Sequence, residues 1–337
     1  LKNTSRIKKM MPPEAFKDFR QWVCSAALTR DQVIAYIQAN ATDQGESRTL
    51  ESKEPVAIAT RWLKEEHTSD GVPTLRKYAK RWYHHDGQRY ADVDEEAFIR
   101  GGLYRWLLNR DYQQAKEDGT VEVLPYEADK HKITNIIDAL TMDCPLQADP
   151  PCWLDGRTDP PPHHLVAFPN GVLNVNEYLR TGVADLIPLS PLYFSMNVRP
   201  YDFDPAAKCP VFDKFIREAL PTDGKKAMLA DEWMGLLNLP DSSYQKLMIV
   251  NGPSGSGKTT WMGALITMLG SHQCCHPTLS GMGQDYALAQ FVGKLGAFIG
   301  DGQLDPTARK MIIMERLKEL TGSAKPMLMV RRMQIAE

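Results

Sequence analysis

The sequence has no long hydrophobic run and no excess of charge of either sign. No apolar stretch approaches the roughly 18 residues needed to cross a bilayer, and the N-terminal residues lack the apolar segment of a secretory signal. Forty Lys and Arg against 42 Asp and Glu give a formal net charge of −2, so bulk charge does not attract nucleic acid. We expect a cytoplasmic protein without membrane contact, in which any DNA contact is local.

The six cysteines include no Cys-x-x-Cys pair, and a chain of 337 residues has no need of disulfides for a stable core. We therefore expect reduced thiols. One cluster, His272, Cys274, Cys275 and His276, has zinc-binding residue types but no second spaced pair to complete a tetrahedral site. We favour an ordinary loop there, with zinc as the alternative. The pairs His84-His85 and His163-His164 are interpreted as surface histidines.

The composition, 43% hydrophobic and 24% charged residues, is that of a folded globular protein. The length allows two or more domains. Breaker residues at Asn40–Ser52 and the proline-rich stretch Pro145–Pro162 mark boundaries, because each proline removes a backbone donor and disfavours helix before it. We predict a multidomain α/β protein in four parts: a helical N-terminal segment and linker at 1–52, a small α+β or helical domain at 53–162, a β-rich connector at 163–208, and a P-loop ATPase domain at 209–337.

Hydrophobic periodicity predicts the elements of these parts. In the small domain we expect helices at Ala57–Glu66, Asp94–Asn109 and Lys130–Leu140, and a hairpin whose arms, Leu75–Trp82 and Gln88–Asp92, flank His85-Asp86-Gly87. The connector and the last part are predicted to contain strands at Leu165–Phe168, Gly171–Val175, within 188–201 and at Lys246–Val250, and helices at Val211–Leu220 and Lys226–Leu237.

The strongest motif is a complete P-loop pattern, a glycine, four variable residues and Gly-Lys-Thr. Its residues are Gly252, Pro253, Ser254, Gly255, Ser256, Gly257, Lys258 and Thr259. A predicted strand precedes it, and a helix from Thr260 to Leu269, capped by Gly270, follows. The glycines let backbone N–H groups close around phosphate oxygens. We predict ATP and Mg²⁺ as cofactors, with Lys258 on the terminal phosphates and the Thr259 hydroxyl on the metal.

A P-loop ATPase also needs a carboxylate at the end of a neighbouring strand. The run from Leu295 ends in Asp301, which we predict to be the second metal ligand and a catalytic residue; an ordinary turn aspartate is the alternative. Gly302 and Gln303 follow, so no second acid stands beside it to serve as general base. Asp305 and Glu315 are the remaining candidates.

From about Leu165 onward the sequence resembles the superfamily 3 helicases of phage and plasmid primase-helicase proteins. Residues 55–165 look, less specifically, like the helical domain that precedes the motor in that family. Besides the P-loop, the resemblance is carried by Phe168–Leu173, Tyr201–Pro205 with Cys209-Pro210 and Phe212, Tyr286–Ala289 with Val292–Lys294, and Leu317–Gly322.

The resemblance implies a three-layer, AAA+-like P-loop domain that works as a hexameric motor on single-stranded DNA in replication, with a primase upstream as an open possibility. It implies DNA contacts near the Leu317–Gly322 segment, and the candidates are Lys318, Lys325, Arg331 and Arg332; ordinary solvated charge is the alternative. The sequence departs from the family at Ser323-Ala324, where an acid often stands, and at the missing second acid.

The resemblance also places the sensor residue and the arginine finger beyond Glu337. We therefore expect the 337 residues to bind ATP but hydrolyse it slowly. Two other functions stay open, an ATP-binding assembly module that has lost hydrolysis and a P-loop phosphotransferase.

A group of aromatic and basic residues has two interpretations, a DNA-stacking patch or a hairpin with a buried aromatic face. The group consists of Trp82, Tyr83 and Tyr90 beside Arg76, Lys77, Lys80, Arg81 and Arg89.

Overall fold

The structure is a computed structural model that describes residues 48–108, 110–115, 120–220, 224–241, 243–285, 287–300 and 309–322. Its contacts divide the chain into two units, one of Leu1–His67 with Asp94–Asp143 and one of Thr68–Val93 with Cys144–Glu337. The strands within Thr68–Val93, which the sequence assigns to the domain at 53–162, thus group with the second unit. Among the described residues, no helix combines the length and the apolar character needed to span a bilayer.

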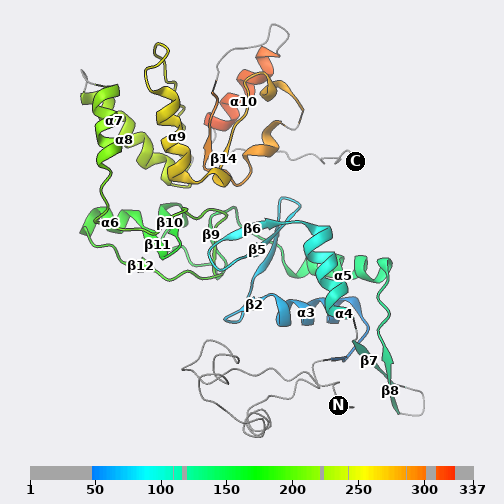
Figure 1. The fold of residues 1–337 in the computed structure, drawn as a ribbon. Coiled ribbons are helices and arrows are strands. Elements are labelled where there is room, and N and C mark those ends of the chain that lie inside the picture. The colour runs from blue at the N-terminus through cyan, green and yellow to red at the C-terminus, as the bar shows by residue number, and fades with distance from the viewer. Residues whose placement is uncertain are drawn as a thin grey trace, which may run out of the picture. The chain divides into compact units, whose positions relative to one another are not determined.

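The first unit is a small helical cluster with a β-hairpin (Figure 1). Its helices are α3 (Pro55–Glu66), α4 (Gly101–Leu107) and α5 (Lys130–Asp143); α3 packs on α5, and a π-helical turn, η2 (Glu95–Arg100), leads into α4. The Asp94 carboxylate caps η2 by accepting from the Ala97 amide at 2.6 Å. The three helices predicted here are confirmed. The sequence did not predict the hairpin of β7 (Asp111–Ala115) and β8 (Val121–Pro125), nor β1 (Thr49–Leu50), which pairs with β7.

Two leucines provide a test of this core: Leu103 lies in α4, and Leu108 is the C-cap of the same helix. Leu103 is fully buried and Leu108 is 70% exposed. We expect Leu103→Ala to lower the free energy of unfolding by about 2–5 kcal/mol, because it leaves a cavity. Leu108→Ala should change it by no more than about 0.5 kcal/mol. Urea denaturation of both variants checks this; equal effects would contradict the placement of the core.

The second unit begins with antiparallel strands around a buried aromatic cluster. After the short pair β2 (Thr68–Ser69) and β3 (Val72–Pro73), β4 (Leu75–Tyr78), β5 (Arg81–His85) and β6 (Tyr90–Val93) form a three-stranded sheet. The sequence predicted the turn after His85 but not the turn at Ala79 and Lys80, whose φ angles are 47° and 66°. Two-residue turns of this kind usually carry Asn-Gly, so Ala-Lys gave no signal.

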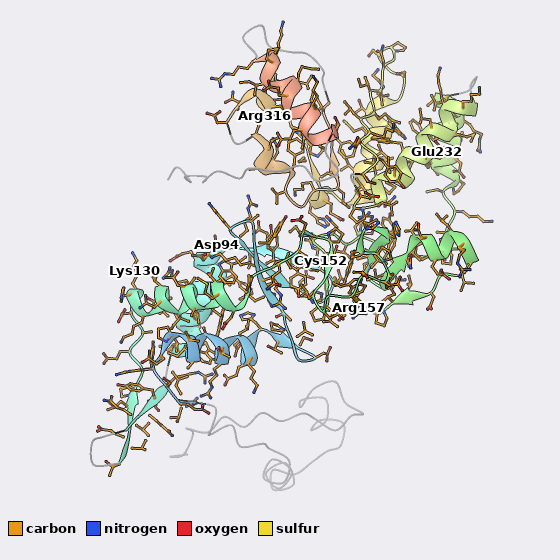
Figure 2. All side chains as sticks on the ribbon, turned by 180° about the vertical axis from the view of Figure 1, so that it is seen from behind. Asp94, Lys130, Cys152, Arg157, Glu232 and Arg316 are labelled. Atoms are coloured by element: carbon orange, nitrogen blue, oxygen red, sulfur yellow. The ribbon has the colours of Figure 1, made fainter. Side chains whose placement is uncertain are left out.

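A β-rich region follows, within which the predicted connector lies. Strand β9 (Cys152–Trp153) pairs with β13 (Tyr193–Phe194), and β10 (Leu165–Phe168), β11 (Gly171–Asn174) and β12 (Leu186–Ile187) form an antiparallel sheet. Cys152, labelled in Figure 2, packs in one core with Tyr83, Tyr90 and Phe194. Helix α6 (Val175–Thr181) lies where the sequence indicated only a turn, and Gly182 ends it in the left-handed conformation.

The last part of the second unit contains α7 (Pro210–Ala219), α8 (Gly224–Asn238), α9 (Lys258–Leu269) and α10 (Lys310–Gly322). These confirm the predicted helices at 211–220 and 226–237 and the helix after the P-loop. Strand β14 (Cys274–Cys275) pairs in parallel with β15 (Gly296–Ala297). Arg316 of α10, labelled in Figure 2, donates to the carbonyl oxygens of Met282 and Gln284.

The strand predicted at Lys246–Val250 is not formed. The segment runs from α8 to the P-loop without strand pairing, because no strand among the described residues lies beside it to complete a ladder. The described strands β14 and β15 pair only with each other. The three-layer architecture of this part therefore stays a prediction.

One buried group in the β4–β6 sheet makes stability depend on pH. His85, predicted to be a surface residue, is 7% exposed, its ring packs against Tyr90, and its Nδ1 accepts from the Gly87 amide at 3.3 Å. Burial lowers the pKa of His85. The unfolded chain therefore binds a proton at His85 more tightly than the folded chain does. The contribution of neutral His85 to the free energy of unfolding is present above about pH 6.5, and it is lost as pH falls toward the folded pKa.

We therefore expect the unfolding midpoint to fall between about pH 7.5 and about pH 5, and to fall less in His85→Gln. His131→Gln, on an exposed position of α5, is the matched control and should leave the wild-type pH dependence. Thermal unfolding at a series of pH values decides the matter. An identical pH profile in His85→Gln and wild type would show that this imidazole does not contribute.

Candidate functional site: the P-loop

The P-loop has a backbone that requires glycine at two positions. Gly255 and Gly257 have φ angles of 77° and 84°, in the left-handed region that side chains with a Cβ rarely adopt. A Cβ added at Gly257 would also lie 3.0 Å from Cε2 of Phe215, which reaches the loop from α7. The loop therefore turns sharply into α9, with Gly257 as the N-cap.

Lys258 is the first residue of α9, and its side chain folds back over the loop. Its Nζ donates to the carbonyl oxygens of Gly252 and Pro253, both at 2.7 Å, and to Ser256 Oγ at 3.3 Å. The next two residues, Thr259 and Thr260, are exposed. A mobile ammonium, exposed hydroxyls and the positive end of a helix dipole thus meet at one point. This arrangement suits an anionic ligand of the phosphate type.

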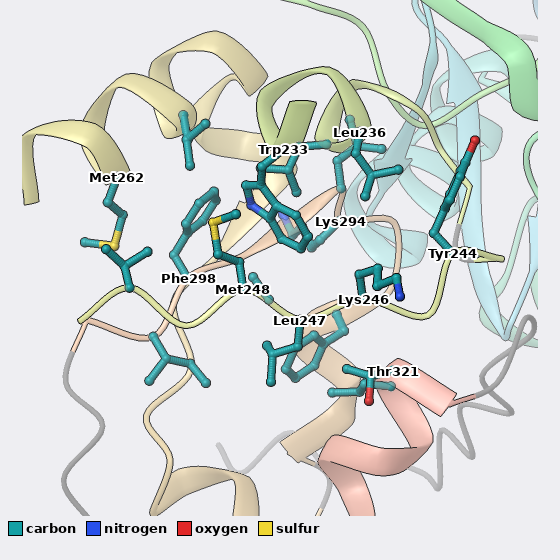
Figure 3. Close-up of a pocket in the computed structure, with 18 of the residues that line it drawn as sticks. Trp233, Leu236, Tyr244, Lys246, Leu247, Met248, Met262, Lys294, Phe298 and Thr321 are labelled. Carbon is teal, nitrogen blue, oxygen red and sulfur yellow. The ribbon is translucent and has the colours of Figure 1, made fainter. Parts of the chain in front are cut away.

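A cavity of about 500 Å³ adjoins the loop. Lys258 and Thr259 line one end, and the remaining walls come from α8, α9, α10 and the segments at 244–250 and 291–300. The lining is largely apolar: Trp233, Met248 and Phe298 point into the cavity in Figure 3. Asp241 is an acidic lining residue, and its Oδ1 accepts from the Ser243 amide at 2.8 Å.

One wall of the cavity is the unpaired segment Lys246–Val250. Leu247 is 55% exposed and Ile249 is 84% exposed, although both are strand-forming residue types. Trp261 of α9 also lines the cavity, and it buries its indole Nε1 with no hydrogen-bond partner among the described residues. The backbone of the loop thus sets the geometry at the phosphate end of the site. Along the segment Lys246–Val250 the site is exposed.

The other predicted catalytic and DNA-binding residues are only partly placed. Glu315 and Lys318 lie on exposed positions of α10. Asp301, the predicted metal ligand, and Asp305 fall outside the described residues, as do the three other DNA candidates, Lys325, Arg331 and Arg332. The structure thus brings together the P-loop residues of the predicted site and leaves the carboxylate and most of the DNA contacts as predictions.

Residues 61–221 match a known protein family. The segment is similar to the family model described as "D5 N terminal like". Domains of this type are found in primase-helicase proteins of phages and plasmids, which agrees with a role in replication and supports the family resemblance seen in the sequence. No curated protein is matched by the chain.

The D5-like segment, residues 61–221, contains the aromatic and basic residues for which two interpretations were open. Trp82, Tyr83 and Tyr90 are all at most 3% exposed. The Tyr90 hydroxyl donates to the Pro191 carbonyl at 2.7 Å, and burial raises the pKa of Tyr90 to about 12. These rings form a core and cannot stack on bases, so the buried-face interpretation holds.

The histidine and cysteine cluster after α9 is likewise structural. Cys274 and Cys275 form β14 and are buried, and burial raises the pKa of Cys275 to about 11, which disfavours the thiolate that zinc requires. Among the described residues, no three His, Cys, Asp or Glu side chains are grouped to hold a metal ion.

The sequence did not single out Phe215 as part of the site. It lies three residues after Phe212 on α7, a spacing that indicates one helix face but not the contact with Gly257 across 42 residues of chain (257 − 215). Helical spacing identifies which side chains share a face, and only the tertiary structure shows what that face covers.

The loop geometry is tested by two substitutions of the same kind. Gly257→Ala introduces a Cβ at positive φ, which costs about 1–2 kcal/mol before the contact with Phe215 is counted. Gly263→Ala, in the interior of α9 with open space around it, should instead stabilise by up to about 1 kcal/mol through helix propensity. Urea denaturation should give opposite signs. A neutral or stabilising Gly257→Ala would mean that the loop does not have this conformation.

Proposed function

We propose that this chain binds ATP with Mg²⁺ through its P-loop and is the ATPase motor of a DNA helicase of the phage or plasmid primase-helicase type. The observation that carries the proposal is the geometry of the loop. Positive φ at Gly255 and Gly257 turns the chain into α9, and the Lys258 ammonium sits at the N-terminus of that helix.

The chain's own groups account for binding. Backbone N–H groups of the loop and the first turn of α9 would donate to phosphate oxygens, where the helix dipole adds partial positive charge. Lys258 would exchange two carbonyl acceptors for phosphate oxygens, and hydrogen bonds between ionised groups are about twice as strong as neutral ones. The exposed Thr259 hydroxyl, with Asp301, would hold Mg²⁺, which supplies charge neutralisation on the transferring phosphoryl group.

The D5-like segment supports the replication part of the proposal, because domains of this type occur beside helicases in phage and plasmid primase-helicase proteins. Translocation on single-stranded DNA, through Lys318, Lys325, Arg331 and Arg332, and assembly as a hexamer rest on the family resemblance. Lys318 is exposed on α10, as a DNA contact requires.

A second candidate is an ATP-binding module without hydrolysis. The described acid in the cavity lining, Asp241, already accepts a hydrogen bond from its own turn, and Gly302 and Gln303 stand where a second acid would follow Asp301. A hydrolytic motor needs a group that orients the attacking water. ATP binding without DNA-stimulated turnover would favour this module over the motor.

Lys258→Ala tests the assignment directly. We expect nucleotide affinity to fall on the order of tenfold or more, because a hydrogen bond to a charged group contributes about 1.5–3 kcal/mol, and we expect hydrolysis to be lost. Lys310→Ala, on an exposed position of α10, is the matched control and should bind and hydrolyse ATP as wild type does. The measurements are nucleotide titration and ATP turnover with and without single-stranded DNA. Wild-type affinity in Lys258→Ala would refute the site.

A further inference from the structure

A buried arginine joins the D5-like segment to the P-loop part of the second unit. Arg199, 2% exposed, follows β13 in the connector, and its amide donates to the Ala167 carbonyl of β10 at 2.9 Å. Its guanidinium donates to three acceptors: Asn238 Oδ1 at 2.7 Å, the Asn238 carbonyl at 2.5 Å and Gln273 Oε1 at 3.1 Å. Arg199 lies within residues 61–221, whereas both side-chain partners lie outside them.

The partners of Arg199 stand at the ends of two helices. Asn238 is the last residue of α8. Gln273 donates through Nε2 to the Val198 carbonyl and to the carbonyl of Leu269, the last residue of α9, both at 2.5 Å. The Gln273 carbonyl also accepts from the Leu295 amide at 2.8 Å, immediately before β15. Counting backbone and side-chain hydrogen bonds together, five separate stretches of chain thus meet at Arg199 and Gln273.

The charge on Arg199 is balanced without a carboxylate. All the hydrogen-bond acceptors that the described residues offer its guanidinium are neutral oxygens, and one of them is the carbonyl at the negative end of the α8 dipole. Burial lowers the pKa of Arg199 to about 10, so it stays protonated at neutral pH. A buried cation is costly, and an uncharged residue would fill the space more cheaply. What a guanidinium adds is a rigid planar fork that reaches two helix ends at once.

We propose that Arg199 is a positioning residue that, through Asn238 and Gln273, ties the C-terminal ends of α8 and α9 to the connector, so that ligand binding at the N-terminus of α9 stabilises the connector. The inference rests on the proposed nucleotide binding at the P-loop. It adds a coupling between the P-loop site and the D5-like segment. The P-loop motif by itself does not predict this coupling.

The coupling follows from the rigidity of α9. The helix has 12 residues, so its ends are about 18 Å apart and move as one body. Lys258 stands at one end, and Leu269, held by Gln273, at the other. A ligand that fixes the first end restricts the second. Because coupling between binding equilibria is reciprocal, a connector stabilised by the ligand must strengthen ligand binding by the same factor.

The experiment measures hydrogen exchange in the connector, at residues 193–199, in the full 337-residue chain with and without a non-hydrolysable ATP analogue and Mg²⁺. In wild type we expect the analogue to slow exchange on the order of tenfold, within the usual range of such couplings. In Arg199→Gln the analogue should still bind, because the P-loop is intact, but with affinity reduced by the same factor and without slowing exchange there.

Arg180→Gln is the matched control. Arg180 is an exposed arginine of α6, also within the D5-like segment, and pairs with Glu177 at the surface, so its variant should keep both the slowing and the affinity. If Arg199→Gln does not fold, Arg199→Lys replaces it, since lysine retains the charge but lacks the fork; we expect loss of the slowing with binding retained.

Each outcome has a distinct meaning. Full slowing of exchange in an Arg199 variant that binds the analogue overturns the inference. So does a wild-type protein that binds the analogue without slowed exchange at 193–199, and in that case nucleotide binding itself stands. A folded wild-type protein that fails to bind the analogue overturns the proposed function, and the coupling with it.

Discussion

The second unit depends on hydrogen bonds between one buried guanidinium and the ends of two helices. A helix leaves its last carbonyl groups without partners, and burying them unpaired is costly. Arg199 meets this need at the end of α8, and Gln273, which accepts from Arg199, meets it at the end of α9. The two helices are thereby fixed to the strand region that carries Ala167 and Val198. The direction of α9, and hence the position of Lys258, follows from this junction.

The P-loop adds a second constraint that is local. Its path is decided by residues without a Cβ at positive φ, and the contact of Phe215 with Gly257 leaves no room for a larger residue. The path of the loop is thus set by its own backbone together with the Phe215 contact from α7. The segment Lys246–Val250 differs. It has the residues of a buried strand, but it pairs with no described strand and lies beside an apolar cavity.

The function proposed for the chain depends on two parts of it. The D5-like segment is similar to domains of phage and plasmid primase-helicase proteins, and the P-loop is the part to which the proposed nucleotide binding is assigned. Neither alone would indicate a motor, because P-loops occur in many unrelated enzymes and the segment by itself contains no P-loop. Under the proposed function, the hydrogen bonds of Arg199 to Asn238 and Gln273 are where the D5-like segment meets the P-loop part.

The sequence by itself determined the features that arise from neighbouring residues. Apolar residues at helical spacing determined α3, α5, α7 and α8, and the Gly-Lys-Thr pattern identified the loop. Only the tertiary structure decided what depends on distant partners. Burial of Tyr83 and Tyr90 follows from packing with Phe194 and Cys152, and spacing alone could not distinguish it from a basic surface patch. The strand at Lys246–Val250 was predicted from composition and is not formed, because a strand is defined by a neighbour and the described chain provides none. Arg199 looked like any other arginine, since a side chain's role as a junction is set by the helix ends that surround it in space and leaves no local pattern.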